Sequence, residues 1–286
     1  EGVGFGELRD YFVWKVAHTY APYMSKDFID AMVHWNADLY GISRVSPRWR
    51  KCFFTVSNAL QQHISQLYID AFFPKEAREA ATGLLEGMRV QFAEDMDTVP
   101  WMNPATRTKA KAKLEMMGFA VGGPAEWEPR EPLVLGGGFL ADTVRIDTAQ
   151  GKREVTSLLK APSRTKWSMA STTVNAYYDR NKNGLFIPAA ILQPPFFNAT
   201  FPAARNAGGI GTILGHEMTH GFDDQGRRYD GSGWLHKWWD SATEGAYDAR
   251  AQCIAKQYGN FTVSGGARVN GELTLGEDIA DGGGLK

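Results

Sequence analysis

The sequence predicts a mainly α-helical protein with a small β-sheet, and three observations support this fold class. Apolar residues recur at helical spacing over long stretches, two polar-proline pairs have the pattern of helix starts, and two β-prone runs flank an Asn-Gly turn. With 286 residues, of which 43% are hydrophobic, the chain can bury the core of one large domain or of two smaller ones.

The charge balance excludes some classes of function. The formal net charge is -1 and there is no basic stripe, so we expect no nucleic-acid partner. No apolar run is long enough to cross a bilayer, so we expect no transmembrane segment in this portion. The chain begins at Glu1 without a signal-peptide pattern and ends at Lys286 directly after a glycine-rich motif, so we expect it to be part of a longer protein.

The first part of the chain is expected to be helical. Ser46-Pro47 has the pattern of an N-cap followed by proline at the first helical position. Helical spacing then predicts one long helix that buries a stripe, formed by Trp49, Cys52, Val56, Leu60, His63 and Leu67. We interpret the histidine of this stripe, His63, as a packed side chain and not as a metal ligand.

Two more helices are expected before a break. One covers residues 76–97, and Asn103-Pro104 repeats the cap signal for the next. That helix carries a basic run that we interpret as a solvated face, formed by Arg107, Lys109, Lys111 and Lys113. Residues 121–140 are rich in glycine and proline, including Pro129 and Pro132, and predict a boundary or crossover.

A hairpin and two helices complete the expected elements. Residues 174–178 and 185–187 are short β-prone runs, and Asn183-Gly184 between them suits a tight turn. The helical pattern returns over residues 204–222, and a further helix is expected to begin at Glu277.

The strongest chemical signal is the run His216-Glu217-Met218-Thr219-His220. Histidines at i and i+4 lie one turn apart on one helix face, so both imidazoles can reach a single ion at about 2.0–2.1 Å. Glu217 can then accept a proton from a water that the metal activates, as the general base of peptide hydrolysis. The alternative is a chance match on a surface helix. Histidine is scarce in this chain, and the small, apolar run over residues 208–215 favours burial.

A zinc site of this kind needs a third protein ligand and one open position, and Glu277 is the best candidate. Asp281 follows it at i+4 on the same helix face, where it can accept a hydrogen bond from the far nitrogen of a ligand histidine. Two acids at this spacing could also form a solvated face. The neighbouring Ile279, Ala280 and glycines favour burial instead.

These motifs resemble those of the neprilysin-like (M13-type) zinc peptidases, which include endothelin-converting enzymes and related bacterial oligopeptidases. The similar stretches are residues 174–178, 186–197, 215–226 (GHEMTHGFDDQG), 258–261, 269–271 and 275–285 (LGEDIADGGGL). Weaker similarity extends upstream through residues 48–52, so the resemblance covers nearly the whole chain.

The resemblance implies a thermolysin-like zincin catalytic lobe plus part of a helical second lobe, enclosing a cavity that admits short peptides. Residues 1-125 would belong to the helical lobe, and residues 126-286 to the catalytic lobe, truncated at its C-terminus. It implies one Zn2+ per chain, with catalytic roles for Glu217 and Asp281. The expected activity is that of a zinc endopeptidase that cleaves short peptides on the amino side of large hydrophobic residues, although the isolated segment could be inactive.

The resemblance also implies how a peptide is held. The substrate would pair with an exposed sheet edge, with Asn175 supplying a side-chain amide and Ala176 a backbone carbonyl. Both could instead belong to an ordinary strand near a turn. Ile191, Phe196 and Ile213 would line an apolar pocket for the residue after the scissile bond, although such residues pack in cores by default.

The sequence departs from the family pattern in three ways. Asp278 and Gly282 stand where the family usually has asparagine, which leaves the ligands intact but affects their surroundings. The family also places a histidine and an arginine downstream, beyond residue 286, where they stabilise the oxyanion and anchor the substrate. Without them, stabilisation of the tetrahedral intermediate would be incomplete, and one such donor is typically worth about 10²–10³ in rate.

The cysteines and sequons bear on location. Cys52 and Cys253 could be buried free thiols, could pair with each other, or could each pair outside this segment. Vertebrate-type members of the family pair cysteines placed like these with outside partners, so the resemblance argues against a mutual bridge. Asn198 and Asn260 begin sequons that would accept glycans in a secretory compartment. We therefore expect an extracellular or secretory location, as in the ectodomain of a membrane-anchored protein.

Two functions stay open at this point. The first is an active zinc oligopeptidase acting on peptide substrates, completed by N- and C-terminal segments or by a second chain. The second is a non-catalytic, peptidase-like binding or scaffold subunit that retains the zinc motif. The intact set of His216, Glu217, His220 and Glu277 favours the first.

Overall fold

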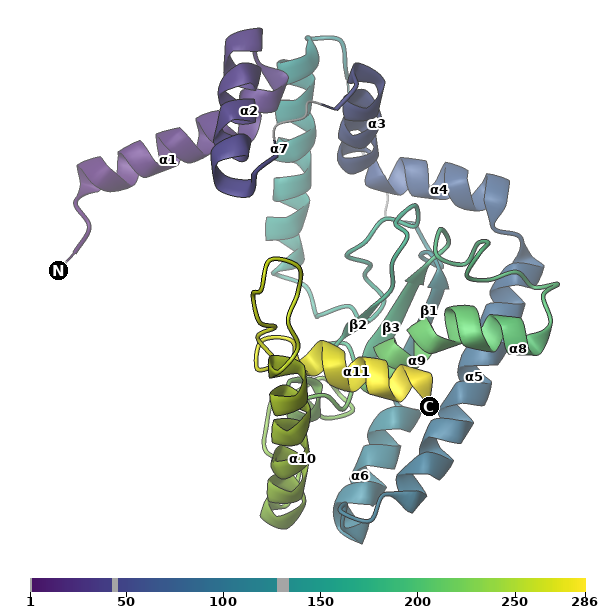
Figure 1. Ribbon diagram of the computed structural model, residues 1–286. Coiled ribbons are helices and arrows are strands. Elements are labelled where there is room, and N and C mark those ends of the chain that lie inside the picture. Colours follow the sequence, from purple (N-terminus) through teal and green to yellow (C-terminus); the bar gives the residue numbers. More distant parts are fainter. Residues whose placement is uncertain (1, 43–45, 128–133) are drawn as a thin grey trace. The chain divides into compact units, whose positions relative to one another are not determined.

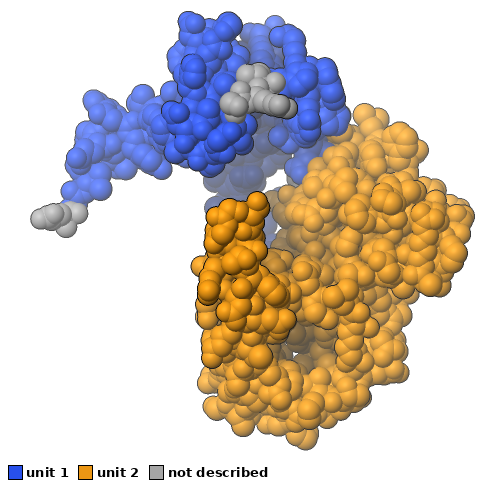
Figure 2. Space-filling model, in the orientation of Figure 1, with its two compact units in different colours: residues 1–61, 128–162 blue, residues 62–127, 163–286 orange. Residues whose placement is uncertain are grey.

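The computed structural model describes residues 2–42, 46–127 and 134–286, which form two compact units (Figures 1 and 2). Unit 1 comprises residues 1–61 and 128–162, and unit 2 comprises residues 62–127 and 163–286. The chain therefore leaves unit 1, builds part of unit 2, returns, and then completes unit 2. The lobe boundary expected between residues 125 and 126 stays a prediction.

Unit 1 is built from helices. They are α1 (Phe5–Tyr20), the short η1 (Ala21–Tyr23), α2 (Lys26–Tyr40), α3 (Arg48–Ala59) and α7 (Phe139–Ser157). The helices α1, α2 and α3 contain no buried residue, whereas α7 buries Thr143 and Ile146. The side chain of Gln150 in α7 donates a hydrogen bond to the carbonyl oxygen of Ala59 at the end of α3 (3.0 Å).

The prediction of one long helix with a buried stripe is wrong. The segment forms two helices, α3 and α4 (Gln61–Phe72), because Leu60 leaves the helical conformation at φ -115° and ψ 37°. A break of this kind changes the helical phase, so residues on either side no longer share a face. In addition, α3 buries none of its residues: Trp49 is exposed, as is Leu67 of α4, and His63 is half-buried. Pro47, not Ser46, is the N-cap of α3.

Two predicted helices of unit 2 are confirmed. The helix expected over residues 76–97 is α5 (Lys75–Thr98), and the cap signal at Asn103 begins α6 (Pro104–Glu115). The Asn103 side chain accepts a hydrogen bond from the Thr106 main-chain N–H (2.8 Å), as an N-cap residue does.

The interpretation of the basic run as a solvated face is wrong for Lys113, whose exposed fraction is 1%. Residues two apart on a helix point about 200° apart, so an alternating run cannot share one face. Lys113 instead lies at helical spacing from Thr106 and Ala110 and beside Leu114, which are all buried. It therefore belongs to the inner face of α6.

A three-stranded sheet lies in unit 2 with the order β1-β3-β2 (Figure 1). The predicted hairpin is confirmed as β2 (Tyr177–Asp179) and β3 (Gly184–Pro188), which pair antiparallel. Asn183 in the turn has φ 44°, a left-handed conformation that asparagine tolerates. The strand β1 (Gly118–Gly122) pairs parallel with β3 and was not predicted. Of the expected break over 121–140, Pro129 and Pro132 lie outside the described residues.

The remaining elements of unit 2 are α8 (Ala203–Asn206), η2 (Ala207–Gly211), α9 (Thr212–Thr219), η3 (Gly226–Arg228), α10 (Ser241–Gly259) and α11 (Leu275–Leu285). The helix expected over residues 204–222 corresponds to the run from α8 to α9, in which η2 is a π-helical turn. Leu214 and Met218 of α9 are fully buried in one apolar core with Leu185 and Ile187 of β3. The core thereby fixes the helix that carries the two histidines.

The described elements make the protein mainly helical with a small sheet, which confirms the predicted fold class. Among the residues that the structure describes, no helix is both long enough and apolar enough to span a membrane.

Candidate metal centre

The two histidines lie one turn apart at the end of α9. His220 is the C-cap residue of this helix, and its Nε2 atom lies 2.9 Å from Nε2 of His216. Leu214 and Met218 hold the opposite side of the helix in the core. The helix therefore presents both imidazoles together, with the same ring nitrogen of each directed to one point.

The third side chain of the cluster comes from α11, which packs against α9 (Figure 1). Glycines make this approach possible, because a Cβ on Gly283 would overlap the Thr219 side chain and one on Gly284 would overlap the Thr212 carbonyl oxygen. Glu277 Oε2 lies 3.2 Å from His216 Nε2 and 3.5 Å from His220 Nε2. One ligand atom from each residue thus lies within 4.8 Å of the others.

A carboxylate fixes the far nitrogen of each ring. His216 Nδ1 is 2.8 Å from Asp281 Oδ1, and His220 Nδ1 is 2.7 Å from Asp223 Oδ2. A carboxylate only accepts hydrogen bonds, so each Nδ1 carries the proton and each neutral ring keeps a lone pair at Nε2.

Three electron-pair donors, the two Nε2 atoms and the Glu277 carboxylate, therefore converge on one point. A hydrogen bond between the rings would require an additional proton on one of them, whereas a divalent cation satisfies all three donors. Two nitrogens bound to tetrahedral zinc lie about 3.3 Å apart. The two Nε2 atoms are 2.9 Å apart in this structure, so the imidazole rings need to separate by only a few tenths of an ångström to bind zinc. The residues present therefore fit the ion.

Asp223 is a site residue that the sequence reasoning missed. Its buried carboxylate also accepts hydrogen bonds from the main-chain N–H groups of Gln225 (2.9 Å) and Gly226 (2.5 Å). Burial lowers the pKa of His220, but the hydrogen bond and charge of Asp223 raise it, and the net shift is upward. The sequence did contain a signal for this role, because Asp223 is an acidic residue three positions after His220, in the turn that follows the helix.

Glu217 is a buried carboxyl group with 6% of its surface exposed. Burial raises its pKa, whereas the two histidines and a main-chain hydrogen bond from Tyr178 lower it, and the net shift is upward. A carboxylate with a raised pKa accepts a proton more readily, which suits a general base. Tyr178 belongs to β2, so one of the groups that favour the charged form of Glu217 comes from the sheet.

The expected burial of the α11 acids is wrong. The side chains of Glu277 and Asp281 are 68% and 64% exposed, because they reach across the open side of the cluster towards the histidines. The helix instead buries Leu275, Asp278 and Ala280. Asp278 accepts a hydrogen bond from the Thr274 hydroxyl (2.8 Å), and a Cβ on Gly282 would meet nothing within 4 Å. The two departures from the family pattern thus lie away from the converging ligand atoms.

The predicted substrate residues occupy different environments. Asn175 is exposed and Ala176 is buried, directly before β2. Ile191 is buried in the core, whereas Phe196 and Ile213 are half-buried and pack against it. Their roles stay predictions.

The residues that bear on location also lie at or near the surface. Cys52 and Cys253 are both free and exposed, which differs from the buried thiols that one interpretation expected. Asn260 is exposed, and Asn198 is half-buried with its side-chain oxygen accepting hydrogen bonds from Thr200. Pairing outside the segment and glycosylation stay predictions.

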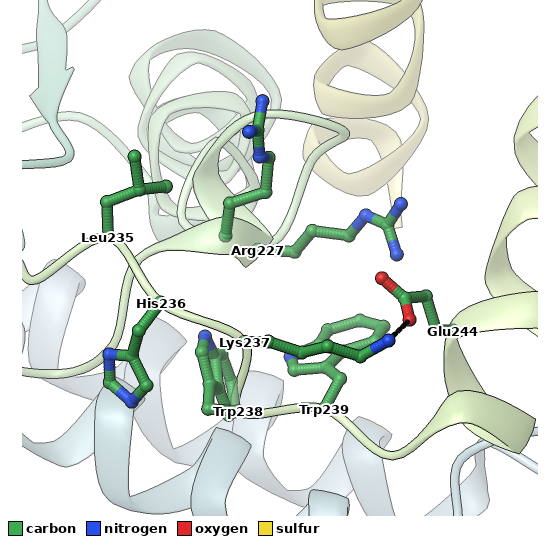
Figure 3. A pocket seen from close by; sticks show the side chains of 8 residues that line it. Arg227, Leu235, His236, Lys237, Trp238, Trp239 and Glu244 are labelled. Carbon is green, nitrogen blue, oxygen red and sulfur yellow. Dashed lines mark ion pairs between the residues drawn. The ribbon is translucent and has the colours of Figure 1, made fainter.

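A separate pocket lies between η3 and the start of α10 and contains none of the cluster residues (Figure 3). Two of its basic side chains have acidic partners: Lys237 Nζ is 2.7 Å from Glu244, and Arg227 is 2.6 Å from Asp248. The metal-ligand chemistry therefore lies outside this pocket.

Two histidines one helical turn apart, a glutamate from a second helix and a buried glutamate beside the first histidine together define the site of a metallopeptidase. The chain belongs to peptidase family M13: the two models of this family match residues 5–124 and 175–286. This confirms the resemblance to neprilysin-like peptidases.

Relatives of known sequence agree with this assignment. The chain is 35% identical over 287 residues to an endothelin-converting enzyme homolog of Locusta migratoria, covering 98% of this chain and 39% of the relative. It is 35% identical over 288 residues to endothelin-converting enzyme 1 of Homo sapiens, covering 98% and 37%. The chain thus spans about two fifths of the length of these relatives.

Solved structures show the same fold. The zinc metalloprotease Zmp1 of Mycobacterium tuberculosis, in complex with an inhibitor, matches 99% of this chain and 44% of its own, with a TM-score of 0.91 and 32% identity. PepO of Lactobacillus rhamnosis matches 94% of this chain and 43% of its own, with a TM-score of 0.88 and 30% identity.

Proposed function

We propose that this chain carries the zinc centre of an endopeptidase that hydrolyses short peptides on the amino side of large hydrophobic residues. The observation that carries the proposal is the convergence of His216 Nε2, His220 Nε2 and a Glu277 carboxylate oxygen, with both far nitrogens held by carboxylates. Family membership and the Zmp1 structure, described as a zinc metalloprotease, support zinc as the ion.

The roles of the side chains follow from their chemistry. A bound zinc ion supplies Lewis acidity towards water and towards the peptide carbonyl. Glu217 takes the proton of the attacking water on its carboxylate and later gives it to the leaving amine. Burial raises the pKa of this carboxyl group in the metal-free protein, and that direction favours the first transfer. Asp281 and Asp223 keep the two imidazoles in the tautomer that leaves Nε2 for the ion.

The outer edge of β2 is proposed to bind the peptide main chain. In the described sheet β2 pairs only with β3, so its other edge can accept a strand, and β2 packs against α9, which carries the general base. Asn175 and Ala176 directly precede β2 in the chain and are proposed to contact the peptide main chain. Ile191, Phe196 and Ile213 are the proposed apolar pocket for the residue after the scissile bond.

The test is hydrolysis of a short quenched peptide by the full-length gene product, together with its zinc content. Glu217→Gln should retain stoichiometric zinc and lose about 10²–10⁴-fold in turnover, because a general base typically contributes that factor. Loss of zinc in this variant would show that Glu217 is a ligand. Stoichiometric zinc without any cleavage by the unaltered protein would favour the non-catalytic binding subunit.

We also propose that segments outside residues 1–286, or a second chain, complete the substrate cavity, since the chain spans about two fifths of its relatives. An extracellular or secretory location is proposed from the sequons at Asn198 and Asn260. A mass shift on deglycosylation of the native protein, absent from variants at both asparagines, tests it.

A further inference from the structure

A buried lysine lies beneath the turn that follows the metal-binding helix. Lys113 is 1% exposed, and its ammonium group donates hydrogen bonds to the carbonyl oxygens of Gly221 (2.5 Å), Gly226 (2.7 Å) and Tyr229 (2.7 Å). Three carbonyl acceptors match the three N–H donors of an ammonium group. An apolar side chain in this position would leave three carbonyl oxygens without this partner.

Aromatic rings surround the same group. Lys113 Nζ lies 5.3 Å from the ring centre of Phe222, 5.8 Å from Trp238 and 6.0 Å from Tyr178. A desolvated cation near ring faces gains a favourable electrostatic contact. The lysine is therefore held at a fixed point between α6, β2 and the segment 221–229.

The three carbonyl groups flank the residue that orients His220. Gly221 lies between His220 and Asp223 in the sequence, and Gly226 donates its main-chain N–H to Asp223 Oδ1. The segment folds back tightly, since a Cβ on Gly226 would overlap the His220 carbonyl oxygen. Lys113 thus binds the chain on both sides of Asp223 without touching a ligand atom.

We propose that Lys113 is a positioning residue of the metal centre: by holding the segment 221–229, it aims the Asp223 carboxylate at Nδ1 of His220. This inference rests on the proposed zinc function. Lys113 binds the carbonyl oxygens of the segment 221–229, this segment binds Asp223 through the Gly226 N–H, and Asp223 binds Nδ1 of His220.

The test compares Lys113→Met with Phe73→Leu. Methionine keeps an unbranched side chain of similar length but removes the charge and all three donors. Phe73 is a buried core residue of the same unit whose ring packs over Gly122 and Arg78, at the end of β1 away from α6, so it controls for a general loss of stability.

Zinc affinity, measured by competition with a chromophoric chelator, should fall about 10–100-fold in Lys113→Met, as it does when a group that orients a ligand is removed. It should stay within about twofold of wild type in Phe73→Leu. Adding Lys113→Met to Asp223→Asn should have little further effect, because both changes act through one contact chain. Two outcomes would overturn the proposal: equal losses of zinc affinity in Lys113→Met and Phe73→Leu, or additive losses when Lys113→Met is combined with Asp223→Asn.

A second readout needs no metal. In the zinc-free protein, the amides of Gln225 and Gly226, which donate to Asp223, should exchange with solvent at least tenfold faster in Lys113→Met relative to amides of the core strand β3. Unchanged relative exchange would overturn the role of Lys113. Absence of zinc binding by the unaltered protein, with faster exchange in the variant, would instead refute the proposed function and leave the loop-holding role standing.

Discussion

The two imidazoles of the metal centre are oriented by carboxylates in very different surroundings. Asp223 is buried and also accepts two main-chain hydrogen bonds, so it is part of the fold of its own turn. Asp281 is largely exposed, and its bond to His216 Nδ1 is 2.8 Å long. A substitution of Asp223 would therefore change both zinc affinity and the stability of the fold. A substitution of Asp281 should change zinc affinity alone.

Asp281→Ala is expected to weaken zinc binding roughly 10–100-fold, because the His216 ring loses the partner that fixes its orientation and tautomer. The unfolding temperature of the metal-free protein should change little, since an exposed side chain contributes little to packing. Chelator competition and thermal unfolding measure the two quantities. Glu272→Ala, the loss of an exposed acid shortly before α11, is the control and should change neither. Unaltered zinc affinity in Asp281→Ala would mean that Asp281 does not orient His216.

The sequence predicts some of these residues and not others for a physical reason. His216, His220, Glu277 and Asp281 obey a helical spacing of four, which is a local rule that needs only the helix to form. Lys113 depends on a contact with carbonyl groups more than a hundred residues away in the chain. Its position in an alternating basic run therefore suggested solvent, and only the assembled fold reveals the acceptors.

At the scale of elements, the crossing of α9 and α11 sets the distance between the histidines and Glu277. Gly283 of α11 faces Thr219 on α9 so closely that a Cβ at this position would overlap the threonine side chain. The Thr219 hydroxyl donates a hydrogen bond to the Gly215 carbonyl oxygen (2.7 Å), so this side chain has little freedom to move aside. The neighbouring Gly282 faces open space, because a Cβ at this position would meet no atom within 4 Å.

Gly283→Ala is therefore expected to push the helices apart, to cost about 1–3 kcal/mol in free energy of unfolding, and to weaken zinc binding. Gly282→Ala is the matched control. It should be neutral or stabilising by up to about 1 kcal/mol, because alanine is the better helix former and meets no neighbour. Denaturant unfolding of the metal-free protein and chelator competition measure both. Equal behaviour of the two variants would show that the close crossing does not determine the site.

The elements themselves were predictable where a local signal decides the outcome. The Asn103 cap and the Asn183-Gly184 turn are such signals, and both elements form as expected. The break at Leu60 could not be predicted, because no glycine or proline lies there and the apolar residues keep their helical spacing through it. The strand β1 was missed because its five residues gain their partner only from β3, more than sixty residues later.

At the scale of the molecule, the three proposed ligands all belong to unit 2 (Figure 2). They join two segments about 60 residues apart, so a bound ion closes a long loop and restricts the unfolded chain. Unit 1 contributes no side chain to the described cluster. The effect of zinc on stability should therefore be large and localised.

Zinc at about 100 times its dissociation constant should raise the free energy of unfolding by about 2.7 kcal/mol relative to the chelator-treated protein. Hydrogen exchange should slow in α9 and α11, which the ion joins, and should stay unchanged in α1 and α2 of unit 1. His216→Ala should abolish both effects, because it removes one of three ligands. His236→Ala should preserve them, since this half-exposed histidine faces Asp230 and lies outside the cluster. Stabilisation that survives in His216→Ala would place the ion elsewhere, and protection spread equally over unit 1 would contradict a site built by α9 and α11 alone.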